Sequence, residues 1–370
     1  MTRFTQAYVV PVSTYLAVAI AGGYGTGREV VQFFSGHGAM GGLFGIGLSA
    51  LLLALTTALS FEFARLHRVY DYRSFLQELI GPYWILFEVL YLLLLFIVLA
   101  VVTSAAGAML SNRIGVSENY GLFAMVAIIG CLLFFGRSVV ERSMVIVTAL
   151  LAVAFSYYFV AVISADGSRI LEQLNQSGPV GRSWIRSAAQ FALYSGVAAV
   201  IALFSTTGID RRIDAFRSGA LCGVLIMVPG LLFHLSFLGR LDEVNAATVP
   251  IYWMIDRIDA PALMPIYLVA MFATFLGTGL GFLQALNERL DAWSMGRHGR
   301  RMGGIAHVGV GVVGLLISAG LAQFGIIALI ARGYGTMAWG FLVVFFVPLL
   351  TVGASKIWNG AFSTRAKLSV

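Results

Sequence analysis

Long apolar stretches alternate with short polar ones along the whole chain. There are ten apolar stretches, at approximately residues 7–34, 40–64, 83–110, 120–135, 145–163, 184–204, 220–238, 262–286, 303–322 and 334–352. A helix needs about 20 apolar residues to cross the hydrocarbon core of a bilayer, and only the fourth stretch is clearly short of that length. The pattern predicts an all-α polytopic membrane protein, with about ten transmembrane helices in a single domain over residues 1–370.

The charged residues support this prediction and give it an orientation. Only 11% of residues are charged and 59% are hydrophobic, and the mean hydropathy is +0.89, whereas about a quarter of the residues of a soluble domain are charged. Most of the 24 lysines and arginines fall in loops on one side if the N-terminus is cytoplasmic, as the positive-inside rule requires. We therefore predict cytoplasmic N- and C-termini and a place in the bacterial inner membrane. The net charge of +7 reflects these loops and indicates no nucleic-acid partner.

The first apolar stretch contains a run that holds a regular helix poorly, because each glycine costs about 1 kcal/mol relative to alanine. This run is Gly22, Gly23, Tyr24, Gly25, Thr26 and Gly27. Inside a bilayer, unwound backbone is tolerated only where it is buried in protein or lines a cavity. Free N–H groups at the start of the outer half-helix suit a carboxylate, and free carbonyls at the end of the inner half suit a cation or ammonium. The run therefore predicts a broken helix around a zwitterionic ligand, with a packing kink as the alternative.

Ala21 to Phe34, which reads Ala-Gly-Gly-Tyr-Gly-Thr-Gly-Arg-Glu-Val-Val-Gln-Phe-Phe, resembles the YkvI family of bacterial membrane proteins. This family is grouped with the amino acid permeases of the amino acid–polyamine–organocation superfamily. The length and number of spans agree over the whole chain, and later spans match only in pattern. The resemblance implies a LeuT-like fold, with two inverted five-helix repeats over residues 1–165 and 183–354. In that fold, helices one and six are broken and line a site near the midplane.

The second break implied by the resemblance falls in the sixth apolar stretch. The candidates for this half of the substrate site are Gln190, Tyr194, Ser195 and Gly196. One serine and one glycine also occur in helices that use them only for packing, so ordinary packing remains the alternative.

The resemblance also implies a sodium site between the first and eighth spans. LeuT-like sodium symporters hold an ion between carbonyls of span one and hydroxyls of span eight. The candidates here are a carbonyl near Gly22 and the hydroxyls of Thr274 and Thr278. The alternative is that these threonines bond carbonyls of their own helix. No other cofactor is expected.

Four charged residues within or near the membrane are candidates for gating or coupling. Charge at that depth is expensive and marks functional sites. By the resemblance, Arg28 and Glu29 lie where an outer gate closes against span ten, and Arg332 precedes that span. Glu88 in span three is a candidate proton carrier, or else pairs with an arginine. Arg3, with Glu288 or Asp291, is a candidate cytoplasmic gate, although plain surface charge is the simpler interpretation of these residues.

The sequence thus predicts a secondary active transporter of a small, zwitterionic solute, an amino acid or related compound, working by alternating access. No nucleotide-binding motif is present, so we expect an ion gradient to supply the energy. Coupling to sodium through Thr274, Thr278 and a carbonyl near Gly22 is favoured over coupling to protons through Glu88. The competing classes are a non-transporting membrane sensor or scaffold, and a channel. An enzyme is not expected, because no nucleophile and base pair stands out. The oligomeric state stays open.

Overall fold

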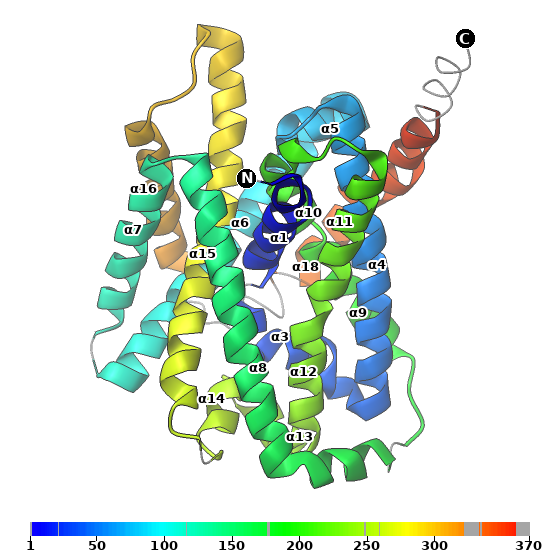
Figure 1. The fold of residues 1–370 in the computed structure, drawn as a ribbon, viewed down its shortest axis with the longest axis vertical. Coiled ribbons are helices and arrows are strands. Elements are labelled where there is room, and N and C mark those ends of the chain that lie inside the picture. Colours follow the sequence, from blue (N-terminus) through cyan, green and yellow to red (C-terminus); the bar gives the residue numbers. More distant parts are fainter. Residues whose placement is uncertain are drawn as a thin grey trace.

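The computed structural model describes residues 2–20, 22–115, 117–175, 178–247, 249–258, 260–321, 333 and 335–359. All regular secondary structure in these ranges is helical, and the helices form one elongated bundle (Figure 1). Eight helices within the described ranges are long and apolar enough to cross a membrane. The other two predicted spans are the first, which is broken, and the fourth, α7 (Glu118–Phe134), which has 17 residues. These findings confirm the predicted fold class.

The first span consists of four short pieces rather than one helix. The π-helical turn η1 (Thr5–Val9) leads into α1 (Val10–Ala19), and two shorter helices follow, α2 (Gly22–Gly25) and α3 (Arg28–Phe33). Helix α1 ends because Ile20 leaves the helical region, with ψ at 75°. A second interruption lies at Gly27, whose φ of 79° favours glycine. The predicted break is therefore present, but it begins at Ile20, and part of the glycine run is itself helical.

The sixth span is broken as well. Helix α9 (Ser183–Ser195) ends beside Gly196, and the chain continues as α10 (Ala198–Ile201) and the 3₁₀ helix η4 (Ala202–Gly208). A Cβ atom on Gly196 would lie 2.5 Å from Cζ of Phe346 and 2.8 Å from the carbonyl oxygen of Ala192. Only glycine fits between these neighbours without a shift, which explains a small residue at this point.

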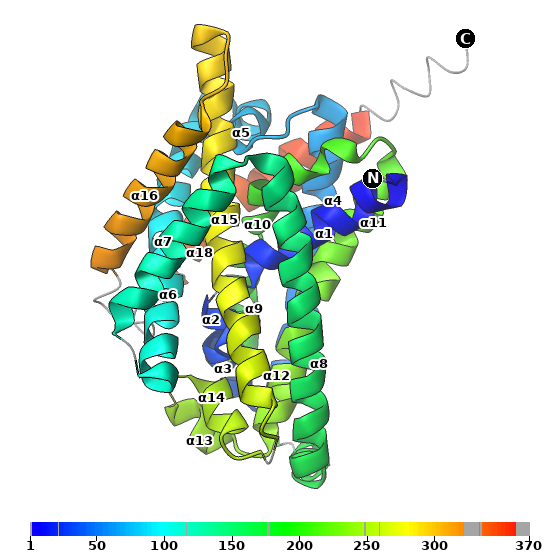
Figure 2. The same cartoon turned by 60° about the vertical axis from the view of Figure 1, so that its left-hand side comes forward.

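The remaining helices surround these two broken spans. Figure 2 shows α2 and α3 in the interior of the bundle, close to α9 and α15. The long helices are α4 (Gly38–His67), α6 (Trp84–Ile114), α8 (Arg137–Asn175), α11 (Arg212–Leu225), α12 (Met227–Leu238), α15 (Leu263–His298) and α16 (Gly304–Leu321). The last span contains α18 (Gly335–Phe341) and the π-helical turns Leu342–Phe346 and Leu349–Gly353. Three short helices are α5 (Tyr72–Ile80), α13 (Leu241–Ala246) and α14 (Pro250–Ile255).

The two ends of the bundle differ in the elements that cover them. The N-terminus and α5 lie at one end, and α13 and α14 lie at the other (Figure 1). We name the first the inner end and the second the outer end, following the prediction from the charged loops. At the outer end, Pro250 opens the short helix α14, and α8 runs without interruption through Ile170, Leu171 and Leu174.

Helices α4 and α11 pack with their backbones in direct contact. A Cβ atom on Gly219 would lie 2.5 Å from Cα of Ala58, and one on Gly223 would lie 2.0 Å from the backbone nitrogen of Ala54. The hydroxyl of Thr57 donates a hydrogen bond to the carbonyl of Gly219 across the same contact. Small residues allow this approach, as is common between membrane helices.

Candidate functional site

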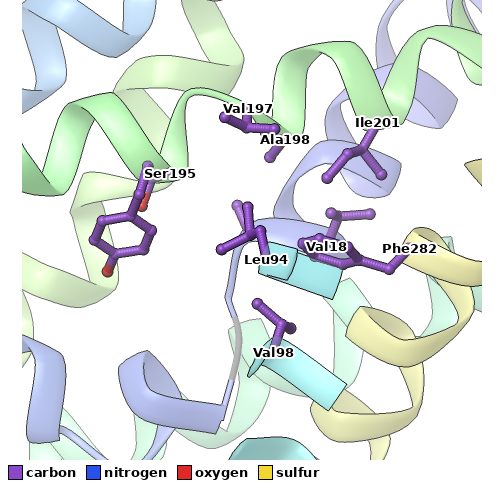
Figure 3. Close-up of a pocket in the computed structure, with 10 residues that line it drawn as sticks. Val18, Leu94, Val98, Ser195, Val197, Ala198, Ile201 and Phe282 are labelled. Carbon is purple, nitrogen blue, oxygen red and sulfur yellow. The ribbon is translucent and has the colours of Figure 1, made fainter. Parts of the chain in front are cut away.

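A small cavity lies where the two broken spans meet near the middle of the bundle. Its volume is about 30 Å³. Figure 3 shows the labelled side chains around it. The lining residues are Val18 and Ala19 in the last turn of α1, Leu94 and Val98 on α6, Phe282 on α15, and Tyr194, Ser195, Val197, Ala198 and Ile201 on the sixth span. A cavity of this size holds about two water molecules, so the site is closed in this conformation and must widen to admit a larger solute.

The cavity combines an apolar wall with the exposed ends of two helices. Its side chains are largely aliphatic, and Ser195 supplies a hydroxyl. Helix α1 ends at Ala19 and α9 ends at Ser195. The carbonyls of Ala17 and Ile20 accept from Thr278, and those of Ala192 and Tyr194 accept from the backbone N–H groups of Gly196 and Val197. The arrangement therefore places backbone acceptors beside an apolar pocket. Chemically it suits a solute with a charged or polar group at one end and an apolar group at the other.

Three oxygen atoms converge between α15 and the end of α1. The Thr278 hydroxyl lies 3.2 Å from the carbonyl oxygen of Ala17 and 3.2 Å from that of Ile20. Thr278 is fully buried, so these oxygens are shielded from bulk water. Neutral oxygen ligands suit a hard cation such as sodium, and unwound carbonyls coordinate such ions in transporters of this architecture. The group of oxygens fits the ion that the sequence predicts at Thr278.

The other two predicted ion ligands are arranged differently. The hydroxyl of Thr274 donates to the carbonyl of Ala270, 2.8 Å away in its own helix, which is the alternative weighed for threonines in membrane helices. Gly22 begins α2, and the carbonyls that contact Thr278 come from Ala17 and Ile20, upstream of it. The sequence missed these two because a backbone carbonyl carries no residue-type signal.

Glu29 is buried beside the sixth span. Its side chain is 1% exposed, and the hydroxyl of Tyr194 donates a 2.6 Å hydrogen bond to its Oε2 atom. Its Oε1 atom is buried without a hydrogen-bond partner among the described residues. Tyr194 also lines the cavity. One tyrosine therefore connects the buried acid of α3 with the central site.

Arg28 points away from its acidic neighbour. Its Nη1 atom donates to the carbonyl of Asn245 at 2.9 Å and to that of Ala247 at 3.3 Å. Arg28 thus holds the segment around α13 against α3 at the outer end. The predicted contact between Glu29 and Arg332 concerns a position outside the described residues.

The outer end is closed over the first break by α14. The backbone N–H of Ile251 donates to the carbonyl of Thr26 at 3.3 Å. A Cβ atom on Gly27 would lie 2.8 Å from Cζ of Phe237 and 3.0 Å from Cγ1 of Ile251. The hydroxyl of Tyr267 on α15 donates to the carbonyl of Gly25. Helices α12, α14 and α15 therefore pack directly against the glycine run.

The remaining predicted substrate-site residues contact other helices. The hydroxyl of Tyr24 donates to the carbonyl of Ile226 at 2.7 Å, at the junction of α11 and α12. Gln190 on α9 points toward α18, with its amide nitrogen 3.9 Å from the position of a Cβ on Gly335. Gly23 lies within α2. Of the predicted set, only Tyr194 and Ser195 line the cavity itself.

Glu88 has an arginine partner. Its carboxylate lies 2.9 Å from Nε of Arg289 on α15, and both side chains are mostly buried. Glu88 lies on α6 on the inner side of Leu94, so this ion pair joins α6 and α15 between the cavity and the inner end. This geometry matches the alternative in which Glu88 pairs with an arginine.

The inner end is held closed around α1, but by a residue that the sequence analysis missed. Arg3 forms a 2.8 Å ion pair with Asp214 in the first turn of α11, and the hydroxyl of Tyr8 donates to the same carboxylate at 2.7 Å. The predicted partner Asp291 lies 3.0 Å from His307 instead. The expected pairing of Arg3 with Glu288 or Asp291 is therefore wrong, because loop packing, invisible in the sequence, decides which acid lies near the N-terminus.

A second, polar cavity of about 350 Å³ opens beside these inner contacts. It is lined by Gln6, Val10, Glu141, Ser205, Thr207, Gly208 and Asp210. Its walls are thus the first span, α8 and the end of the sixth span.

Comparison with solved structures identifies the class of fold. A Na⁺-coupled sialic acid symporter in a substrate-bound, outward-open state matches with a TM-score of 0.70 at 12% identity, over 93% of this chain and 79% of that one. MhsT in complex with L-phenylalanine matches with a TM-score of 0.65 at 12% identity, over 96% and 98%. A manganese transporter of Eremococcus coleocola matches with a TM-score of 0.60, over 94% and 79%. The chain has the LeuT fold, and identities this low establish the fold alone.

The chain is also similar in sequence to a known membrane protein. The chain is 23% identical over 286 residues to the uncharacterized membrane protein YkvI of Bacillus subtilis (strain 168), which covers 75% of this chain and 80% of that protein. This similarity confirms the resemblance drawn from the first span. No family model matches the chain.

Proposed function

We propose that this protein is a secondary active transporter that moves a small zwitterionic solute across the bacterial inner membrane, coupled to sodium. The observation that carries the proposal is the set of three buried oxygens, Thr278 Oγ1 and the carbonyls of Ala17 and Ile20, at the break beside the central cavity. An ion held there would fix the end of α1 against α15. Occupation of the site would therefore set the position of one wall of the substrate cavity.

The substrate class is inferred from the two kinds of surface around the cavity. Helix ends from the first and sixth spans offer carbonyl and N–H groups to a carboxylate and an ammonium. Leu94, Val98 and Phe282 offer an apolar surface to the rest of the solute. An amino acid or a related compound with a modest aliphatic side chain fits this combination. The neighbour MhsT, whose structure holds L-phenylalanine, is compatible with this class.

Sodium is favoured over a proton at Glu88 because Glu88 is paired with Arg289. Removing one partner of such a pair leaves an uncompensated charge at high cost. Glu88 is therefore better suited to holding α6 against α15 than to gaining and losing a proton. The proposal also takes residues 1–165 and 183–354 as the two repeats that move relative to each other, with both termini cytoplasmic.

The test is sodium-dependent uptake by proteoliposomes, screened over amino acids and related solutes. A transporter shows saturable uptake that requires an inward sodium gradient. Gly25→Leu should abolish uptake by filling the space at the first break, where a Cβ would already lie 2.3 Å from Cε of Met271. The variant should still fold, because this atom is the flexible end of a side chain. Gly47→Leu is the control, since no atom lies within 4 Å of a Cβ at that position.

A non-transporting sensor or scaffold would show no uptake of any solute and would tolerate Gly25→Leu. A channel would show flux that neither saturates nor follows the sodium gradient. Either result would overturn the proposal.

A further inference from the structure

Glu29 is a buried acid with one hydrogen-bond partner among the described residues, close to the closed outer end. Glu29 lies on α3 and is 1% exposed. The Tyr194 hydroxyl, 2.6 Å from Oε2, is its only hydrogen-bond partner among the described residues, and Oε1 is buried without one. A buried carboxylate is normally paired or fully hydrogen-bonded. The Oε1 atom of Glu29 has neither an ion-pair partner nor a hydrogen bond among the described residues.

The cationic groups nearby are directed elsewhere. Arg28, the adjacent residue, donates to the carbonyls of Asn245 and Ala247. The other ionisable side chains on the elements packed against α3 are Tyr24, His37, Arg186, Tyr194 and His234. Tyr24 bonds the Ile226 carbonyl, His37 bonds Ser183, Arg186 lies over the Trp339 ring, and His234 bonds Ser35 and the Ala39 carbonyl. None of the described cations forms an ion pair with Glu29.

The surroundings therefore favour the neutral acid while the outer end is closed. Burial in a low-dielectric interior penalises the ionised carboxylate, and no opposite charge among the described residues offsets this penalty. A protonated, neutral carboxyl group would incur little of this burial penalty. If α14 moves away from Thr26 and Gly27, water reaches α3 and the ionised form becomes stable.

The same acid is connected to the cavity through Tyr194. The ring of Tyr194 lines the cavity, and its hydroxyl is fixed by Glu29. The state of Glu29 thus acts on a side chain that lines the cavity.

We propose that Glu29 is a proton-binding site that is filled when the outer end closes. On closure, a proton from the outer solution binds to the carboxylate, and on opening it returns to the same solution. Acidic outer solution therefore stabilises the closed state, and alkaline solution favours opening. This inference rests on the proposed function, in that the outer end opens and closes.

The test measures how often the outer end opens as a function of pH. Cys131→Ser and Cys222→Ala remove the two native thiols, and Ile251→Cys places a reporter at a side chain that is 0% exposed beneath the closed end. The rate of alkylation by a membrane-impermeant maleimide is measured from about pH 5.5 to 8.5. Gly178→Cys, an exposed position, gives the rate of a free thiol at each pH, and the ratio of the two rates removes the titration of the thiol.

With Glu29 in place, the ratio should rise with pH by up to about tenfold per pH unit, the limit for one linked proton. Glu29→Gln keeps an acceptor for Tyr194 but cannot ionise, so its ratio should be low and flat. Glu243→Gln, which removes an exposed acid on α13, should leave the rise unchanged. Tyr194→Phe removes the one hydrogen bond that the described residues donate to the Glu29 carboxylate, so the rise should extend to higher pH.

A flat ratio with Glu29 present, or an unchanged rise in Glu29→Gln, would overturn the proton site. The labelling needs neither substrate nor sodium, so its failure is independent of the transport assay. Sodium-driven uptake combined with a flat ratio would leave the transporter standing without the proton site. A normal rise without uptake of any solute would leave the proton site and overturn the transporter.

Discussion

Replacing Thr278 by valine removes the hydroxyl from the proposed sodium site and leaves its shape nearly unchanged. Thr278 is fully buried on α15, and its hydroxyl is 3.2 Å from two carbonyl oxygens of the first span. Threonine and valine have similar volumes but differ in this polar group. The variant therefore tests one oxygen atom, with the surrounding packing kept.

Two free-energy changes are expected. Without an ion, the carbonyls of Ala17 and Ile20 lose their shared donor, and leaving a buried acceptor unsatisfied costs about 1–3 kcal/mol. With the ion, binding to the folded state alone adds about 2.7 kcal/mol at a concentration of about 100 Kd. If the loss of one ligand weakens binding by about 100-fold, the same sodium concentration adds only about 0.4 kcal/mol.

The assay is thermal unfolding of the purified protein in sodium chloride and in potassium chloride at equal ionic strength. The native chain should melt about 3–4 °C higher in sodium, taking the average entropy of unfolding per residue with the stabilisation above. Thr278→Val should melt lower in potassium and show almost no gain from sodium. Thr274→Val is the matched control, because among the described residues its hydroxyl bonds only the Ala270 carbonyl of the same helix. This variant should keep the higher melting temperature in sodium.

A sodium gain that survives in Thr278→Val would refute the assignment of these three oxygens as the ion site. If the native chain melts no higher in sodium than in potassium and its uptake does not depend on sodium, transport must be coupled to another ion. Loss of the gain in Thr274→Val as well would mean that the Thr274 hydroxyl leaves Ala270 to join the ion.

Three further predictions concern packing and the two closed ends. Gly223→Ala should destabilise the fold by about 1–3 kcal/mol, measured by thermal unfolding, because its Cβ would lie 2.0 Å from the backbone of α4; Gly47→Ala, with no atom near, should be neutral. Gly27→Ala should cost about 1–2 kcal/mol for the left-handed backbone, since φ is 79°, and a hydrogen exchange rate unchanged over residues 22–33 would contradict this. Arg3→Ala removes the ion pair with Asp214, in which the arginine side chain is 49% exposed, so the loss of stability should stay below about 1 kcal/mol. Hydrogen exchange over residues 5–19 should therefore speed up by about fivefold at most. A larger change would mean that the pair does more than close the inner end.

The sequence predicted those parts of the candidate site whose function depends on the type of side chain. Four glycines followed by Arg28 and Glu29 are abnormal in an apolar helix, and Thr278 is a hydroxyl in an apolar face, so these positions stand out in the sequence. Ala17, Ile20, Leu94 and Val98 do not, since they resemble lipid-facing or core residues. Their role comes from where α1 ends and where α6 passes, which are properties of the packed bundle.

By itself, the sequence determined the membrane setting, the approximate spans and the presence of a break in the first span. Each of these follows from local physics, since apolar length fixes a span and glycine weakens a helix. Only the tertiary structure decided which groups meet: Thr278 with two carbonyls of the first span, Glu29 with Tyr194, Glu88 with Arg289, and Arg3 with Asp214. These contacts join residues far apart in the chain. They depend on the packing and register of whole helices, which many side chains determine together and no single motif records.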